Sequence, residues 1–300
     1  MTSITASWTK VRQEEGFVSV FPLPSLPELQ AFYAQQYYQQ SASASYQQAY
    51  SDLELDYKRM QARLMLHAID QSGERAGTLL DVGCGEGFLL AEAARQNLDV
   101  SGIDFSAHAI ERFHPELRKT IEIGDAFALL DNMMESGRRF DACVLQNVLE
   151  HVIDPRGLLD RLRQLLTPSG RLLITLPNDY SRVQQVAMDT GAIETEYWFS
   201  PPQHLHYFTI AAAAALAASR GLAVLDTFAD FPIEAYLFHP GSNYVRQRCA
   251  GPDAHKARMI MSLICAESGM DAYLTLSRAY AGCGVGRAFT MILGAKEASR

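Results

Sequence analysis

Residues 78–88, Thr-Leu-Leu-Asp-Val-Gly-Cys-Gly-Glu-Gly-Phe, constrain the fold of this chain more than any other stretch. The apolar run from Thr78 to Val82 predicts a buried strand, and the glycines that follow at every second position predict a turn. A helix is then expected from near Gly87. Strand, glycine turn and helix form the entry unit of a doubly wound α/β sheet, and a turn without Cβ atoms can hold a ligand against bare backbone.

The side chains around this turn narrow the kind of ligand. A dinucleotide-binding turn requires G-x-G-x-x-G, but Phe88 stands where the third glycine should be. Asp81 would repel a pyrophosphate, whereas its charge suits the ammonium group of an amino acid. The turn therefore favours a ligand with a cationic group and disfavours a nucleotide-dependent oxidoreductase. A turn that only joins a strand to a helix is the alternative.

The stretch resembles motif I of the class I S-adenosylmethionine-dependent methyltransferases, whose acid-x-Gly-x-Gly-x-Gly pattern it matches residue by residue. The resemblance implies that S-adenosylmethionine is the methyl donor. It also implies that the turn contacts the donor through Asp81, Gly83, Cys84, Gly85 and Gly87.

Strand ends farther along the chain supply more candidate donor contacts. Residues 100–104 read as a second strand. Asp104 at its end is placed to accept hydrogen bonds from both hydroxyls of a ribose. This resembles motif II, and a surface cap is the alternative for Asp104. Phe105 would lie beside the adenine or pack under the next helix. The family resemblance adds Asp125 and Ala126 as adenine contacts, and Gln146 and Asn147 as contacts of the methionine portion.

The apolar periodicity of the other segments predicts an α/β fold. Its centre would be a doubly wound, seven-stranded, mostly parallel Rossmann-like sheet, to which a helical N-terminal part and inserted cap elements are added. Further strands are expected at residues 121–125, 140–145, 171–176, 222–228 and 288–294. The expected domains are an N-terminal helical cap at 1–77, a donor-binding core at 78–230 and 287–300 with a lid inserted at 178–208, and a helical acceptor-binding insertion at 231–286.

The N-terminal part carries three local patterns. Residues 17–21 alternate as a short edge strand would, and residues 28–40 read as a helix. Ser51 and Glu54 form a capping box that should start a helix reaching about residue 71. Tyrosines gather before this helix and would pack the cap or line the acceptor pocket: Tyr33, Tyr37, Tyr38, Tyr46 and Tyr50.

Two histidines in the expected lid are candidates for catalysis. Methyl transfer to an alkyl hydroxyl needs a general base, most often histidine. His204 and His206 alternate, so an extended chain would place them on one face. They would act as a base or fix the lid through hydrogen bonds. Residues 201–208, together with the end of the chain, resemble a bacterial methyltransferase subfamily whose members act in pathways for quinones, lipids and surface sugars.

A third candidate, His151, follows Glu150 just after the strand at 140–145. With Asn147 these residues stand at i, i+3 and i+4, which would share one face of a helical turn. Packing, acceptor contact or base, and metal ligation are the alternatives for His151. In the quinone-biosynthetic O-methyltransferases a Glu-x-x-Glu-His arrangement has been proposed to hold a divalent ion. Asn147 replaces the first glutamate here, so the sequence predicts no metal.

The composition of the chain limits the kinds of partner that it can bind. A net charge of −8 in 300 residues disfavours nucleic acid as a partner. The main basic cluster is Arg246, Arg248, His255, Lys256 and Arg258, which would form a solvated helix face or bind a phosphate or carboxylate on the acceptor. No run of 18 apolar residues occurs, and the first residues lack the apolar block of a signal peptide, so we expect no membrane span and a cytoplasmic location.

These patterns predict an S-adenosylmethionine-dependent methyltransferase that acts on a small-molecule acceptor. O-methylation is favoured over N-methylation, and a sugar, a quinone or another secondary metabolite would suit as acceptor. The alternative, from another class, is a sensor or partner subunit that binds S-adenosylmethionine or S-adenosylhomocysteine without methyl transfer. The sequence leaves monomer and homodimer open.

Overall fold

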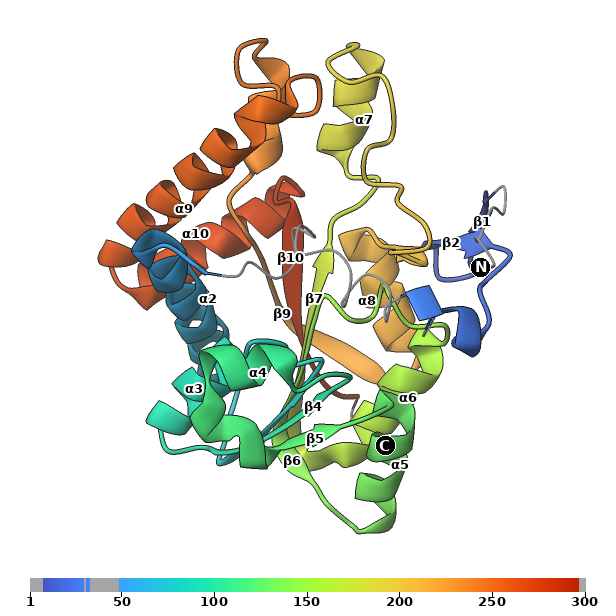
Figure 1. Ribbon diagram of the computed structural model, residues 1–300, viewed down its shortest axis with the longest axis vertical. Coiled ribbons are helices and arrows are strands. Elements are labelled where there is room, and N and C mark those ends of the chain that lie inside the picture. Colours follow the sequence, from blue (N-terminus) through green and yellow to red (C-terminus); the bar gives the residue numbers. More distant parts are fainter. Residues whose placement is uncertain (1–7, 30, 33–48, 297–300) are drawn as a thin grey trace.

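The computed structural model describes residues 8–29, 31–32 and 49–296, and a seven-stranded sheet lies at its centre (Figure 1). The strand order is β5-β4-β3-β6-β7-β10-β9. Only β10 among these strands is antiparallel to its neighbours. The predicted doubly wound, mostly parallel sheet is confirmed. The strand bounds are β3 Thr78–Val82, β4 Asp99–Asp104, β5 Ile121–Ile123, β6 Phe140–Gln146, β7 Leu166–Pro177, β9 Leu222–Ala229 and β10 Ala288–Ala295.

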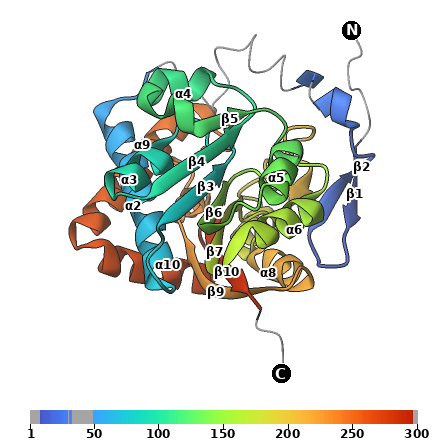
Figure 2. The same ribbon diagram turned by 90° about the horizontal axis from the view of Figure 1, so that it is seen from below.

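Helices cover both faces of this sheet (Figure 2). One face packs against α5 (Ala126–Glu135), α6 (Pro155–Leu165) and α8 (Ile210–Ser219). The other face packs against α2 (Asp52–Gln71), α3 (Phe88–Arg95), α4 (His108–Phe113) and α10 (Met270–Cys283), and the 3-10 helix η1 (Pro115–Thr120) leads into β5.

Local sequence explains where these helices begin. The Ser51 side chain accepts from the Glu54 amide and the Glu54 carboxylate accepts from the Ser51 amide, which is the predicted capping box at the start of α2. Asp154 caps α6 through the Gly157 amide at 2.9 Å, and Pro155 is its first residue. Such caps satisfy amide groups that the first helical turn leaves without partners.

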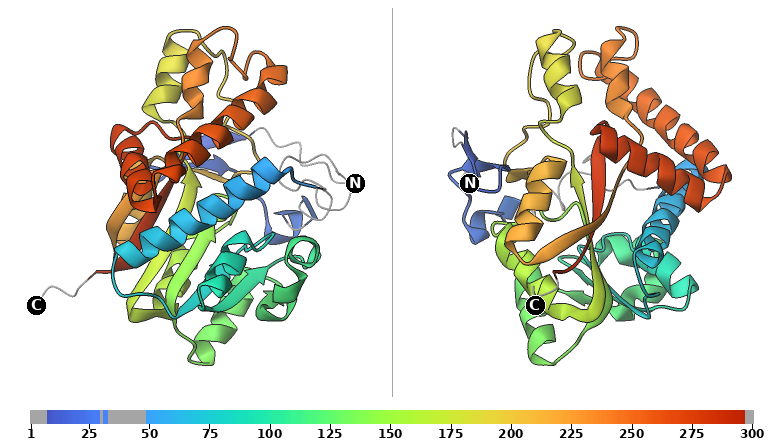
Figure 3. Two further views of the ribbon diagram at one scale, coloured as in Figure 1. Left: turned by 90° about the vertical axis from the view of Figure 1, so that its left-hand side faces the viewer. Right: turned by 180° about the vertical axis from the view of Figure 1, so that it is seen from behind.

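Two inserted segments stand beyond the carboxyl ends of the parallel strands (Figure 3). The first contains α7 (Arg182–Asp189) and the short strand β8 (His206–Tyr207), and the second contains η2 (Ile233–Phe238), η3 (Arg248–Ala250), α9 (Gly251–Glu267) and α10. The Gln184 side chain donates to Glu234 Oε1 at 2.8 Å and so joins α7 to η2. The Asn178 amide donates to the Arg287 carbonyl at 2.8 Å, which joins the start of the first segment to the end of the second.

The N-terminal part departs from the prediction. β1 (Thr9–Arg12) pairs with β2 (Val18–Phe21), and β2 pairs with β8, so the predicted helical cap is mixed rather than helical. The strand expected at 17–21 is confirmed as β2. The helix expected at 28–40 begins at residue 26. Most of that helix, and Tyr33, Tyr37, Tyr38 and Tyr46, lie outside the described residues.

One strand is longer than its sequence pattern indicates. β7 begins at Leu166, five residues before the strand expected at 171–176. Pairing with β6 shifts register between Phe140 and Ala142, which accommodates this early start. Within the described ranges, every helix is too short or too polar to cross a lipid bilayer.

Candidate functional site

The glycine turn after β3 wraps around the end of β4. Gly83, Gly85 and Gly87 all have positive φ, at 77°, 52° and 80°. A Cβ on Gly83 would lie 2.5 Å from Val148 Cγ2, so a larger residue would clash as well as strain the backbone. The Gly83 amide donates to the Ile103 carbonyl at 2.7 Å. The turn therefore lies directly beside the end of β4.

Two acids lie at this turn, as predicted. Asp81 is 1% exposed, and neither of its carboxylate oxygens has a hydrogen-bond partner among the described residues. Burial raises the pKa of Asp81 to about 8, and the nearby charge of Asp104 adds to the shift. Asp104 accepts from the Gly85 amide at 2.8 Å and from the Ser106 amide at 3.0 Å. Burial raises the Asp104 pKa, and these backbone amides oppose the shift.

The other candidate donor contacts occupy the same edge of the sheet. Cys84 is buried within the turn, and burial raises the pKa of its thiol. Phe105 is 59% exposed, so the alternative that it packs under the next helix is wrong. Asp125 caps α5 by accepting from the Ala128 amide at 3.0 Å, a structural role that the sequence analysis did not name. Ala126 is the first residue of α5.

A cavity of about 460 Å³ opens at the carboxyl ends of β6 and β7, beside this edge. Gln146 and Asn147 contribute to its wall, so the predicted contacts of the methionine portion border the cavity. Side chains of α2, α9 and α10 close it, and its apolar and aromatic lining consists of Tyr50, Tyr57, Leu64, Met65, Phe228, Met259 and Tyr273. Its charged lining consists of Glu54, Lys58, Asp230, Arg258 and Arg287.

Helix α2 is tied to the glycine turn by a buried carboxylate. Lys58 Nζ lies 2.8 Å from Glu86 Oε2, and the Tyr50 hydroxyl donates to Oε1 of the same residue. The Lys58 ammonium also lies 4.4 Å from the centre of the Tyr50 ring. Glu86 stands between two glycines of the turn, so these contacts connect the turn to the wall of the cavity.

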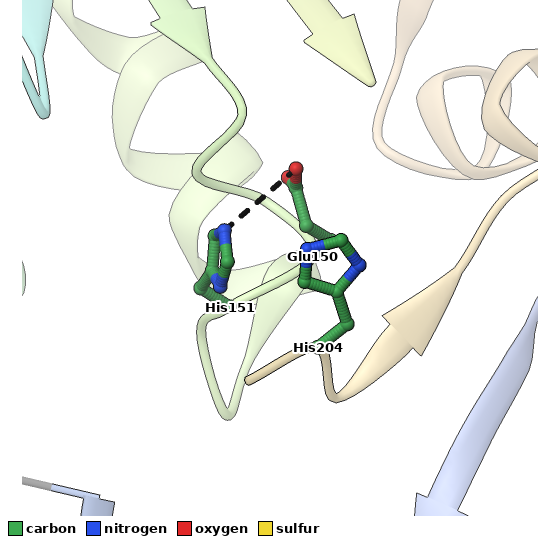
Figure 4. Close-up of side chains that lie close together, drawn as sticks. All are labelled: Glu150, His151 and His204. Carbon is green, nitrogen blue, oxygen red and sulfur yellow. Dashed lines mark ion pairs between the residues drawn. The ribbon is translucent and has the colours of Figure 1, made fainter. Parts of the chain in front are cut away.

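The residues after β6 do not form the predicted helical face. Asn147 has a φ of +52°, and residues 149–151 form a turn, so Asn147, Glu150 and His151 do not share a helix. Instead, His204 from the first inserted segment lies against His151, with ring centres 4.8 Å apart. His151 Nε2 lies 3.8 Å from Glu150 Oε1 (Figure 4).

Glu150, His151 and His204 could hold a metal, because one ligand atom from each lies within 4.8 Å of the others. Burial raises the pKa of Glu150 to about 8 and lowers the pKa of His204 to about 3. Neither oxygen of Glu150 nor Nδ1 of His204 has a hydrogen-bond partner among the described residues. None of the three is part of the cavity wall, although Asn147 and Arg287 next to them are.

His206 contacts other groups than His204 does. It lies in β8, is 3% exposed, and packs against Phe17. Its Nε2 lies 3.0 Å from the Val152 carbonyl and must donate to it, so Nδ1 accepts from the Ser19 hydroxyl at 2.8 Å. Burial lowers the pKa of His206 to about 4. Nδ1 therefore joins β8 to β2, and Nε2 joins β8 to the loop after β6.

The basic cluster of the sequence divides in the structure. Arg246 lies beside the Gly191 carbonyl and Glu194 of the first inserted segment, whereas Arg248 and Lys256 are exposed. Only His255 and Arg258 of this cluster reach the cavity. The sequence analysis missed Lys58, Asp230 and Arg287 as wall residues. Asp230 directly follows β9, and Arg287 directly precedes β10. Their positions at strand ends were the sequence signal that could have identified them as wall residues.

Comparison with known proteins identifies a family that matches more than half of the chain. A family described as "Methyltransferase domain" matches residues 55–227. The ubiquinone biosynthesis O-methyltransferase of Xylella fastidiosa (strain 9a5c) is 36% identical over 103 residues, which cover 33% of this chain and 42% of the relative. The mitochondrial enzyme of the same description from Homo sapiens is 39% identical over 106 residues, 33% of this chain and 28% of the relative. The chain thus spans less than half the length of these curated relatives.

Two solved structures are similar over most of the chain. A SAM-dependent methyltransferase from Archaeoglobus fulgidus has 13% sequence identity and a TM-score of 0.49, with 88% of this chain and 98% of that chain covered. The 1,6-didemethyltoxoflavin-N1-methyltransferase of Burkholderia thailandensis has 16% identity and a TM-score of 0.49, with 97% and 100% covered.

Proposed function

This chain belongs to the methyltransferase-domain family, and we propose that it transfers a methyl group from S-adenosylmethionine to a hydroxyl group of a small-molecule acceptor. One observation carries the proposal. The glycine turn, with Asp81 and Asp104 beside it, follows β3, and the neighbouring strand β6 ends at Gln146 and Asn147, which line a cavity of about 460 Å³. A donor at the turn and an acceptor in the cavity would thus meet at the end of β6.

The residues at the turn fit the donor. The positive φ angles leave bare backbone, and the exposed Phe105 offers a ring face beside the end of β4. Asp104 can accept hydrogen bonds from ribose hydroxyls, because a carboxylate has about four acceptor positions and the backbone amides of Gly85, Phe105 and Ser106 do not occupy all of them. S-adenosylmethionine supplies an electrophilic methyl group on a sulfonium. The role of this chain is to hold donor and acceptor in line and to exclude water.

We propose His204 as the histidine that serves the acceptor, and His206 as a structural residue. At neutral pH the low pKa keeps His204 uncharged, so its Nδ1, which has no partner among the described residues, can accept a hydrogen bond from the acceptor hydroxyl; to act as a base, His204 needs a higher pKa once the acceptor is bound. His204 lies outside the cavity wall, so the acceptor hydroxyl would have to approach past Asn147. A phenol or catechol would need little help from a base, and the names of the matched relatives support an aromatic hydroxyl as acceptor.

The proposal is tested in two steps. Calorimetry measures binding of S-adenosylmethionine and S-adenosylhomocysteine to the full chain. Transfer of a labelled methyl group is then measured with a panel of catechols, phenols, sugars and amines. Donor binding without transfer to any acceptor would favour the sensor alternative, and absence of donor binding would contradict the proposal.

A further inference from the structure

The wall of the cavity formed by α9 and α10 lies outside residues 55–227, the part that matches the family. This wall contains polar groups that the fold does not use. Resting on the proposed function, we propose that it forms a subsite for an anionic oxygen group of the acceptor, a carboxylate or a phosphate. Arg258 and Ser277 would donate to that group.

Arg258 is held in place but retains an unused donor. Its Nη1 lies 3.4 Å from Asp230 Oδ2, and its Nη2 donates to His255 Nδ1 at 2.8 Å. Its Nε is buried and has no hydrogen-bond partner among the described residues. A guanidinium stays protonated inside proteins, so this N–H is a permanent donor. Buried donors without an acceptor are rare, because the loss of hydration is not compensated.

Ser277 presents a second unused group to the same cavity. It is 1% exposed, it lies on α10, and its Oγ has no hydrogen-bond partner in the described part of the chain. Serines inside helices usually donate to the carbonyl one turn earlier, and Ser277 does not. Tyr273, one turn before Ser277, lines the cavity as well. Arg258 and Ser277 thus lie on neighbouring helices, and both residues line this cavity.

The wall of the cavity carries charges of both signs. Lys58, Arg258 and Arg287 line the cavity together with the acids Glu54 and Asp230. Lys58 and Arg287 are engaged by acids that lie outside the wall, Glu86 and Asp179.

Arg258 is the wall cation whose buried Nε–H has no acceptor among the described residues. An oxygen group that carries negative charge and no proton complements such a donor best, since charge-assisted hydrogen bonds are the stronger ones. The apolar lining, which includes Phe228 and Met259, would take the carbon skeleton of the acceptor.

The test compares probes that differ in one charge. Binding of 3,4-dihydroxybenzoate, its methyl ester and phenyl phosphate is measured by calorimetry, with and without S-adenosylhomocysteine. The acid should bind about tenfold more tightly than the ester, as one charge-assisted hydrogen bond would provide. Phenyl phosphate that binds more tightly than the acid would identify phosphate as the anion. Arg258→Gln should remove the preference for charge, and Ser277→Ala should reduce it.

Lys256→Gln is the matched control, because it removes a positive charge from an exposed position on the same helix. It should leave the preference unchanged. If Arg258→Gln lowers the melting temperature, Arg258→Lys keeps the charge beside Asp230 and still lacks Nε. Equal binding of acid and ester, no binding of any probe, or a preference that survives both Arg258 variants would overturn the subsite. Loss of S-adenosylhomocysteine binding with an intact preference would contradict the proposed function and leave the subsite standing.

Discussion

The carboxylate of Asp104 accepts a hydrogen bond from the backbone amide of Gly85 at 2.8 Å. The acid at the end of β4 therefore fixes the glycine turn that follows β3. The parallel register of the two strands, with Val82 opposite Ile103, brings the two ends to the same edge. The Asp104 side chain thus shapes the turn and can still accept hydrogen bonds from hydroxyl groups of a ligand.

Asp104→Ala should weaken binding of S-adenosylmethionine by roughly tenfold to a hundredfold, since hydrogen bonds to a charged group contribute about 1.5–3 kcal/mol. Calorimetry measures this directly. Asp104→Asn keeps an oxygen that can accept from the Gly85 amide, so it separates loss of the turn from loss of the charge. Unchanged affinity in Asp104→Ala would mean that the donor binds elsewhere.

The two lid histidines should behave differently when replaced. His204→Ala should lower turnover by roughly a hundredfold and leave donor affinity unchanged, as expected for loss of a base. His206→Ala should instead lower the free energy of unfolding by about 1–3 kcal/mol, because it leaves the Val152 carbonyl and the Ser19 hydroxyl without their partner.

Turnover and chemical denaturation are measured for both variants. Recovery of the rate in His204→Asn would show that His204 orients the lid through hydrogen bonds. Full turnover in His204→Ala, with loss of turnover in His151→Ala, would move the base to the loop after β6.

Turnover should not require a metal ion. Displacement at a sulfonium needs alignment more than a Lewis acid, and Asn147 occupies the place of one acid in the arrangement proposed for related enzymes. Dialysis against a chelator should therefore leave methyl transfer unchanged. If transfer stopped and a divalent ion restored it, Glu150, His151 and His204 would be its ligands. Glu150→Gln would then raise the ion concentration needed.

The free energy of unfolding should fall as the pH rises from 7 to 8. Burial raises the pKa values of Asp81 and Glu150 to about 8, so the folded protein keeps two protons that the unfolded chain releases near pH 4. Because the folded state binds more protons in this window, the free energy of unfolding decreases by about 1.4 kcal/mol per proton and pH unit. Burial lowers the pKa values of His151, His204, His206 and His255, and these side chains are still partly protonated in the unfolded chain near pH 6.5, so they oppose the trend there and cease to do so as the pH rises above 7.

Asp81→Asn should roughly halve that decrease, because one of the two protons no longer titrates. Urea denaturation at several pH values measures it, with the exposed Asp99→Asn as a control for the loss of one negative charge. A slope that is the same in Asp81→Asn and in the unchanged protein would show that Asp81 is ionised at neutral pH.

The sequence predicts the part of the fold that we assign to donor binding, residues 78–104, better than the rest of the chain. Residues 78–104 alternate strand, turn and helix through local apolar runs and glycines, and both strands appear at the predicted positions. The pairing of Ser19 with His206 joins residues far apart in the chain, and a strand of two residues leaves no periodic pattern. Asn adopts a positive φ more readily than most residues, but the residue type alone does not predict it at Asn147, and this conformation turns Glu150 and His151 away from the predicted face.

The residues that line the cavity are also difficult to predict from the sequence. Arg258 reads as part of a basic helix face, because its sequence neighbours are basic. Only the packing of α9 against α2 directs it to the cavity, where its guanidinium lies 5.8 Å from the centre of the Tyr57 ring. Which face of a helix is covered depends on a partner about 200 positions away in the sequence.

The hydrogen bond from Asn178 to Arg287 has a consequence for how such a protein can diversify. Both inserted segments leave and rejoin the sheet at neighbouring points, and the Asn178 side chain also donates to the Gly286 carbonyl at 3.0 Å. Segments anchored at a shared point can change in length and composition while the strand register stays the same. Selection for a new acceptor can therefore act on these segments while the donor half is inherited unchanged.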